Sequence, residues 1–201
     1  MTDDTIEPPA TLLASLYEMV SDRDYDAVYS PADGMGGGIE KLHVNLGVWD
    51  DCFIPLTLLS LTDLTAADAS EDEPEVQMLH GSAVLPFDIS KDRQSDVVRV
   101  VFMINRALPL CSFGVSVEDG SCYIQTCISV EPGSDLPYRV AEEHIGMTTF
   151  AVQSYGPLIA GVASGELTYQ NCVDQLAEMG VSIQPVPAVR HRVLASSEEV
   201  G

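Results

Sequence analysis

The sequence of 201 residues predicts an α+β fold. Hydrophobic and polar residues alternate on both sides of Asp119-Gly120, a dipeptide typical of a two-residue hairpin turn. Elsewhere, in residues 12–20 and 136–158, hydrophobic residues recur at the spacing of an amphipathic helix. The chain therefore combines paired strands with helices. We expect residues 1–184 to form a single domain and residues 185–201 to form an irregular C-terminal tail.

The composition restricts the class of partner. Lys and Arg number 9 against 31 Asp and Glu, so the formal net charge is −22. A protein that binds a phosphate backbone or an anionic membrane needs a basic patch, which this balance does not supply. We therefore expect no nucleic acid and no membrane among the partners. Hydrophobic residues still make up 46% of the chain, enough for a core.

The sequence also indicates a compartment. Residues 1–7 contain three acidic side chains and none of the basic and apolar regions of a signal peptide. Five cysteines are an odd number for a disulfide framework, so we expect reduced thiols. A cytoplasmic location is the expectation from both observations.

Residues 1–61 are predicted to form one helix and two strands. The first turn with Pro9 and the hydrophobic spacing that follows predict a helix over residues 9–21. Acidic residues 22–33 and glycine-rich residues 34–38 are expected to form loops. Alternation predicts a strand over residues 42–48.

A second strand is expected over residues 53–61, where Pro55 suggests an edge position or a bulge. Residues 62–75 carry acidic side chains and no cation, which is typical of a solvated connector.

The second half begins with a strand over residues 76–89. Residues 97–104 are compatible with a buried strand because of their β-branched side chains, and with a helix because Val97, Val100, Val101 and Ile104 share one helical face. Periodicity leaves both open.

The hairpin of residues 111–131 has a register that follows from its turn. If Glu118 opposes Ser121, the odd-numbered residues before the turn and the even-numbered residues after it face the core. This places Cys122 and Cys127 on opposite faces, which argues against a disulfide or a shared metal between them.

Two helices are expected to end the chain. The first runs from about Tyr138 to Val162, where Gly156-Pro157 should kink or divide it. Thr168 is placed to cap the second, and Gly180 to follow its last turn.

Asp22, Asp24 and Asp26 resemble the start of a calcium-binding loop, with Asp33 at the twelfth position. The sixth position is Ala27 where such a loop needs glycine, and no helix follows the loop. A solvated acidic loop is the better interpretation.

Other motifs for cofactors and metals are incomplete. The glycines at 34–38 lack the Lys-Ser/Thr pair of a phosphate-binding loop. His43, His80, His144 and His191 do not have the spacing of zinc ligands. We therefore expect no cofactor, no metal and no catalytic residue. The alternative hypothesis is a cysteine-dependent hydrolase or transferase in which Cys127, or Cys111, acts with His144.

Residues 85–162 resemble the YbjN-like family of bacterial sensory-transduction regulators, whose fold is similar to that of type III secretion chaperones. The matching features are Pro86-Phe87, the apolar run 97–104, the segment Asn105-Arg106-Ala107-Leu108-Pro109-Leu110-Cys111-Ser112-Phe113, the hairpin about Asp119-Gly120 and the helix from Tyr138. The family implies an antiparallel sheet flanked by helices, a helix over residues 97–107, and homodimers without catalytic residues.

These observations lead to a functional hypothesis. We expect a non-enzymatic protein-binding module, chaperone-like or regulatory, that engages another polypeptide or a second copy of itself through its sheet or helix surface.

Overall fold

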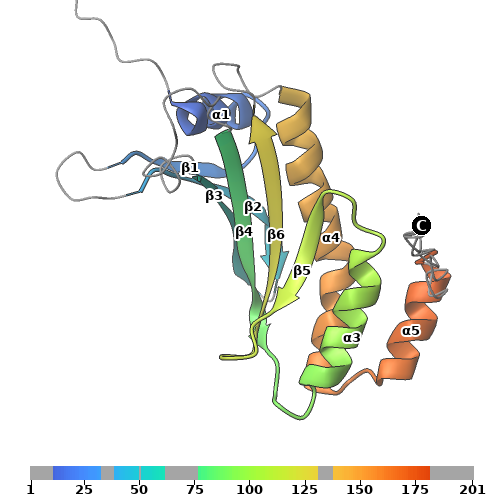
Figure 1. Ribbon diagram of the computed structural model, residues 1–201. Coiled ribbons are helices and arrows are strands. Elements are labelled where there is room, and N and C mark those ends of the chain that lie inside the picture. Colours follow the sequence, from blue (N-terminus) through green and yellow to red (C-terminus); the bar gives the residue numbers. More distant parts are fainter. Residues whose placement is uncertain (1–10, 33–38, 50, 62–76, 131–137, 182–201) are drawn as a thin grey trace, which may run out of the picture.

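The computed structural model describes residues 11–32, 39–49, 51–61, 77–130 and 138–181 (Figure 1). These residues form four helices and one antiparallel sheet of six strands, so the predicted α+β class is confirmed. In chain order the elements are α1 (Leu12–Ser21), β1 (Ala27–Ser30), β2 (Lys41–Trp49), β3 (Cys52–Ser60), β4 (Gln77–Asp88), α3 (Gln94–Asn105), β5 (Cys111–Val115), β6 (Ser121–Val130), α4 (Tyr138–Ser164) and α5 (Tyr169–Glu178).

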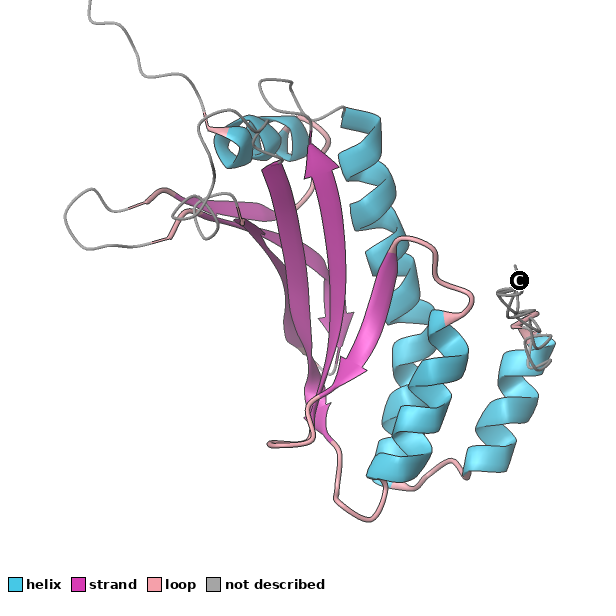
Figure 2. Ribbon diagram, viewed as in Figure 1, coloured by secondary structure: helices cyan, strands magenta, loops and turns pink. Residues whose placement is uncertain are grey.

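The strand order is β1-β2-β3-β4-β6-β5. Alternate side chains of each long strand are buried, because α1, α3 and α4 pack against the same face of the sheet (Figure 2). We call this face the inner face and the opposite one the outer face. The inner face supplies much of the hydrophobic core, including Leu42, Val44, Leu56, Leu58, Leu79, Phe113 and Ile124.

Helix α1 begins later than predicted. Thr11 has extended backbone angles, and its side chain accepts a hydrogen bond of 3.1 Å from the N–H of Ala14. It is therefore the N-cap, and the first helical residue is Leu12. The predicted start at residue 9 lies outside the described residues.

Strand β1 corrects the prediction of a loop over residues 22–33. Ala27–Ser30 pair antiparallel with residues 41–44 of β2. The strand is only four residues long, too short for a recognisable period, and its pairing is what stabilises it. Asp33, residues 34–38, residues 62–75 and residues 185–201, for which loops, a connector and a tail are predicted, lie outside the described residues.

Strand β3 is an interior strand, so the edge position that Pro55 suggested is wrong. Pro55 pairs with Asn45 of β2, and the register of β2 shifts between Asn45 and Val48. The ladder between β3 and β4 runs from Thr57 to Ser60. The bulge therefore lies on β2. Pro55 precedes the paired residues of the β3–β4 ladder, so its lack of an N–H costs that ladder no hydrogen bond.

Residues 94–105 form helix α3, which decides between helix and strand for the ambiguous run. Val97, Val100, Val101 and Ile104 are all buried on one side of α3, against β5 and α4. The helical face was visible in the sequence, and packing against two neighbours selects it.

The hairpin of β5 and β6 has the predicted faces and a different register. Val115 pairs with Cys122, and the N–H of Ser116 donates to the carbonyl of Ser121, so Glu118 does not oppose Ser121. Asp119 Oδ1 accepts hydrogen bonds from the N–H and the hydroxyl of Ser121, which widens the turn. A shift of two residues keeps every strand side chain on its predicted face, but it leaves Val117 in the turn and exposed.

Helix α4 continues through Gly156-Pro157 without division, contrary to one of the two predicted outcomes. A Cβ at Gly156 would overlap the Trp49 ring, so the glycine allows β2 to approach the helix. The last helix follows the prediction: Thr168 Oγ1 accepts from the N–H of Asn171, and Gly180 has φ of 82° after the C-cap.

Candidate binding surface

The outer edge of β5 is closed by a side chain. The Asn105 amide nitrogen donates to the carbonyl of Phe113 at 2.9 Å, and its oxygen accepts from the Phe113 N–H at 2.8 Å. Asn105 thereby takes the place of a neighbouring strand at the centre of the five-residue strand β5. A partner strand could not pair there without displacing it.

At the opposite end of the strand order, β1 pairs only with residues 41–44 of β2, and polar groups occupy part of the β2 edge beyond them. Beyond the paired residues 41–44, the N–H of Gly47 donates to Asn45 Oδ1 at 2.9 Å, and Gln153 Nε2 of α4 lies 3.5 Å from the carbonyl oxygen of Leu46. Gly47 has φ of 136° within the bulge, which twists this edge. The edge of β5 and the uncovered part of β2 are therefore poor templates for an added strand, and the remaining edge strand, β1, is only four residues long.

The outer face of the sheet is left without a helix among the described elements (Figure 1). Asp88, at the end of β4, is the only carboxylate in the six described strands, although the chain carries 31 Asp and Glu. One row across the face consists of His43, Thr57, Ser82, Gln125 and Ser112. The outer face is thus nearly neutral on a strongly acidic protein.

One end of this face carries exposed hydrophobic side chains. Val48, Phe53 and Val84 are 62%, 67% and 63% exposed, and Val48 is the direct pairing partner of Phe53. We call these three residues the outer patch. Pro55 and Pro86 are also exposed in the same region of β3 and β4. Exposed hydrophobic groups gathered on a neutral surface are typical of a protein interface.

The structure does not bring Cys127 and His144 together. Cys127 is exposed on the outer face of β6, whereas His144 is buried beneath the inner face on α4. The alternation of β6 separates them, so the predicted catalytic pair is not formed. Cys127 instead opposes His80 of β4 across the ladder.

His80 and Cys127 line an open hollow of about 470 Å³ near the start of β5. No hydrogen bond joins the thiol to the imidazole within the described part of the chain. The sequence offered no signal for this pair, because it depends on how β4 and β6 align. Cys111 lines the same hollow from the buried side, and burial raises the pKa of its thiol to about 11, which opposes a nucleophilic thiolate.

A buried polar network lies under the inner face. Thr126 Oγ1 donates to the carbonyl of Leu110 at 2.8 Å and lies 2.7 Å from His144 Nδ1. Because the threonine hydroxyl has one proton, His144 must donate from Nδ1 to complete both bonds. Thr148 donates to the carbonyl of His144 at 2.7 Å. The network joins β6, α4 and the segment before β5, and its role is structural.

The stability of the protein should depend on pH through His144. Burial lowers the pKa of His144, because the charged imidazolium loses its hydration. The unfolded chain therefore takes up a proton before the folded one does, and the free energy of unfolding should fall as the pH drops below the ordinary histidine pKa of about 6.5. Urea unfolding at a series of pH values measures this slope.

A His144→Asn variant retains an amide donor for Thr126 and should flatten that slope. A His43→Asn variant removes an imidazole from the outer face and serves as the control, with the slope retained. An unchanged slope in His144→Asn would show that other groups cause the pH dependence.

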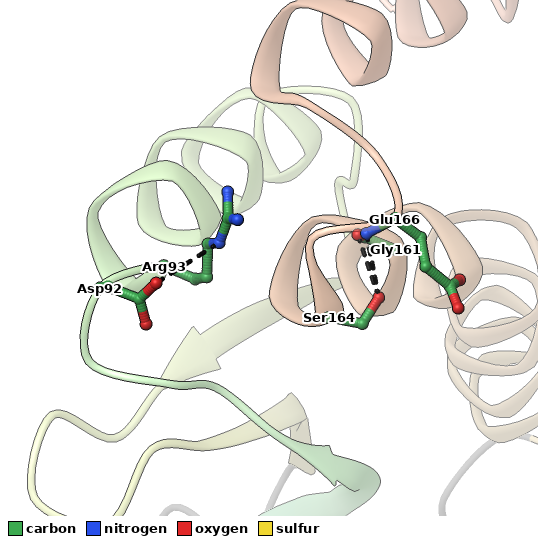
Figure 3. A network of polar contacts seen from close by, with 5 residues as sticks. All are labelled: Asp92, Arg93, Gly161, Ser164 and Glu166. Atoms are coloured by element: carbon green, nitrogen blue, oxygen red, sulfur yellow. Dashed lines mark hydrogen bonds and ion pairs between the residues drawn. The ribbon is translucent and has the colours of Figure 1, made fainter.

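Other polar clusters are structural. Asp22 is the C-cap of α1, and Asp26 accepts a hydrogen bond from the Asn45 amide at 3.0 Å. In the described residues, no group of three or more His, Cys, Asp or Glu could hold a metal ion. At the end of α4, beside the start of α3, Ser164 Oγ donates to the carbonyl of Gly161 and accepts from the N–H of Glu166, which closes the turn into α5 (Figure 3).

Within the described ranges, no helix combines the length and hydrophobicity needed to cross a bilayer. Comparison with protein-family models and with curated proteins gives no match to this chain. The resemblance to the YbjN-like family therefore stays a prediction that rests on residues 85–162.

Proposed function

We propose that the chain is a non-enzymatic protein-binding module, chaperone-like or regulatory, that engages a polypeptide partner through the outer face of its sheet. The observation that carries this proposal is the outer face itself. It lacks a covering helix among the described elements, it is nearly free of carboxylates, and it presents Val48, Phe53 and Val84 to solvent. A cytoplasmic location belongs to the same proposal.

The mode of binding follows from the closed edges. Because Asn105 occupies the edge of β5 and the bulge at Gly47 distorts the edge of β2, a partner gains little by adding a strand. A helix or sheet laid across the outer face can instead cover the exposed side chains, as α4 already does on the inner face.

The charge distribution indicates the chemistry of the partner. A surface with few charges avoids the cost of burying unpaired ions, so the matching surface should be neutral and partly apolar. A second copy of the chain meets this description, since two chains of net charge −22 can approach most easily through their neutral faces. We therefore include a homodimer in the proposal, beside another polypeptide.

A Phe53→Glu substitution tests the proposal. Phe53 is 67% exposed, so the glutamate should leave the fold intact, while a buried charge at the interface should weaken binding by tenfold or more, equivalent to about 1.4 kcal/mol. Sedimentation reports loss of the homodimer, and affinity purification from the native cells reports loss of any other protein partner.

Phe102→Glu is the matched control. Phe102 lies on α3 and is 70% exposed, so it receives the same substitution at the same exposure away from the outer face. A complex retained by the Phe102 variant and lost by the Phe53 variant supports the proposal. Equal retention by both, or a wild-type chain that is monomeric and copurifies with nothing, contradicts it.

A further inference from the structure

A cavity of about 310 Å³ lies between the β2-β3 turn region and helix α4. Its walls include Val48, Trp49, Ile54, Val152, Gln153 and Pro157. The volume is at the lower end of the range for small-molecule sites, so the cavity has room for a group the size of one side chain.

None of the described residues that line this cavity is charged, although the chain carries a net charge of −22. Most of its lining belongs to the inner side of the sheet and to α4, and Val48, which lines it and pairs with Phe53, links it to the outer patch at the uncovered edge of β2. A partner that covers the outer patch and extends past this edge can therefore reach the cavity. The cavity favours an uncharged, largely apolar group from that partner.

The Gly156-Pro157 pair builds the polar part of the wall. Gly156 allows the Trp49 ring to lie against α4. Pro157 has no N–H, so the main-chain carbonyl of Gln153, four residues earlier in the helix, lacks its usual donor. A helical carbonyl points toward the residue four positions later, so that of Gln153 points toward Pro157, and both residues line the cavity. We infer that this carbonyl is the hydrogen-bond acceptor of the cavity, beside the Trp49 ring.

We propose that this cavity receives an aromatic side chain with one hydrogen-bond donor, a tyrosine or tryptophan, from the polypeptide partner that binds the outer face. The inference rests on the proposed function. The ring packs against Trp49, and its O–H or N–H donates to the carbonyl of Gln153. This role also accounts for a proline inside a 27-residue helix, where it normally weakens the helix.

The first test uses p-cresol, the side-chain analogue of tyrosine, and toluene, which lacks the hydroxyl. Trp49 is the only tryptophan of the chain, so its emission reports binding in the cavity directly. We expect saturable binding of p-cresol, with toluene weaker by roughly fivefold, the value of one hydrogen bond. Equal affinity for the two probes, or binding of neither, overturns the proposal.

A Pro157→Ala variant provides the second test. Alanine restores the N–H that the Gln153 carbonyl lacks, so p-cresol affinity should fall roughly fivefold, toward that of toluene, while the melting temperature stays the same or rises. Gly146→Ala is the control, because Gly146 is an exposed residue of α4 with no atom within 4 Å of an added Cβ. It also favours the helix, and p-cresol affinity should not change.

The third test uses the complex that Phe53→Glu disrupts. Pro157→Ala should weaken that complex by a similar factor, roughly fivefold. If Pro157→Ala leaves the complex intact while Phe53→Glu abolishes it, the inference is overturned and the proposed function stands. This holds even where p-cresol binds, because the cavity then binds a free small molecule and not a side chain of the partner. If Phe53→Glu leaves the complex intact, the proposed function fails.

Discussion

Replacing Thr126 with valine is expected to lower the free energy of unfolding by about 3 kcal/mol, because two buried polar groups lose their partner at once. Valine has nearly the shape of threonine, so the change removes the hydroxyl without opening a cavity. The carbonyl of Leu110 loses its donor, and Nδ1 of His144 loses its acceptor. Urea unfolding followed by circular dichroism measures the loss.

Thr149→Val is the control for this substitution. The Thr149 hydroxyl donates to the carbonyl of Ile145, four residues earlier in α4, a bond that adds little because the helix already uses that carbonyl. We expect a small effect there. Similar losses for Thr126→Val and Thr149→Val would contradict the interpretation of Thr126 as the centre of a buried network.

An Asn105→Leu variant should lose about 2 kcal/mol of unfolding free energy, because each of the two hydrogen bonds to Phe113 contributes about half of this value. Leucine is close to asparagine in size and cannot replace either bond. The variant should also associate at high concentration, because the edge of β5 is then free to pair with another strand. Unfolding in urea and sedimentation at several protein concentrations measure the two effects.

Association of Asn105→Leu should survive the Phe53→Glu substitution, because the edge and the outer patch are different surfaces. Asn171→Leu, on an exposed residue of α5, is the control for added surface hydrophobicity. A fully stable, monomeric Asn105→Leu variant would show that Asn105 does not close the edge.

The sequence predicted those parts of the fold whose signal is local. The alternation in β2 and β6 and the spacing in α4 identify which side chains are buried, whereas the pattern of residues 97–104 left strand and helix open until α3 was seen to pack on β5 and α4. The caps at Thr168 and Gly180 were also recognisable, because capping depends on residues within one turn. Strand β1 was missed because four residues carry no period.

Features that depend on contacts between distant elements were not predictable in the same way. The sequence places Thr126 on the inner face, but only the packing of α4 on β6 brings His144 to it. The closed edge of β5 likewise requires the end of α3 to lie beside Phe113. The hairpin turn shifted the register because the Asp119 side chain bonds locally to Ser121.

The candidate site was the least predictable element. The sequence suggested Cys127 with His144, and the fold puts His80 opposite Cys127 instead. The neutrality of the outer face could have been anticipated from the near absence of Asp and Glu in the predicted strands. Which face would remain uncovered is decided by where the helices pack, and no local pattern encodes that.

Two exposed cysteines allow the most direct test of binding through the outer face. Cys127 lies on that face, and Cys52 lies at the start of β3 on the side opposite to Phe53. The measurement is the alkylation rate of each thiol, followed by mass spectrometry, in the isolated chain and in its complex with the partner. Slower alkylation of Cys127 in the complex is the predicted result of binding across the outer face. Cys52 pairs with Trp49 beside the cavity, so its rate should fall only if the partner also extends past the edge of β2 into the cavity. An unchanged rate at Cys127 in a demonstrated complex would contradict binding across the outer face.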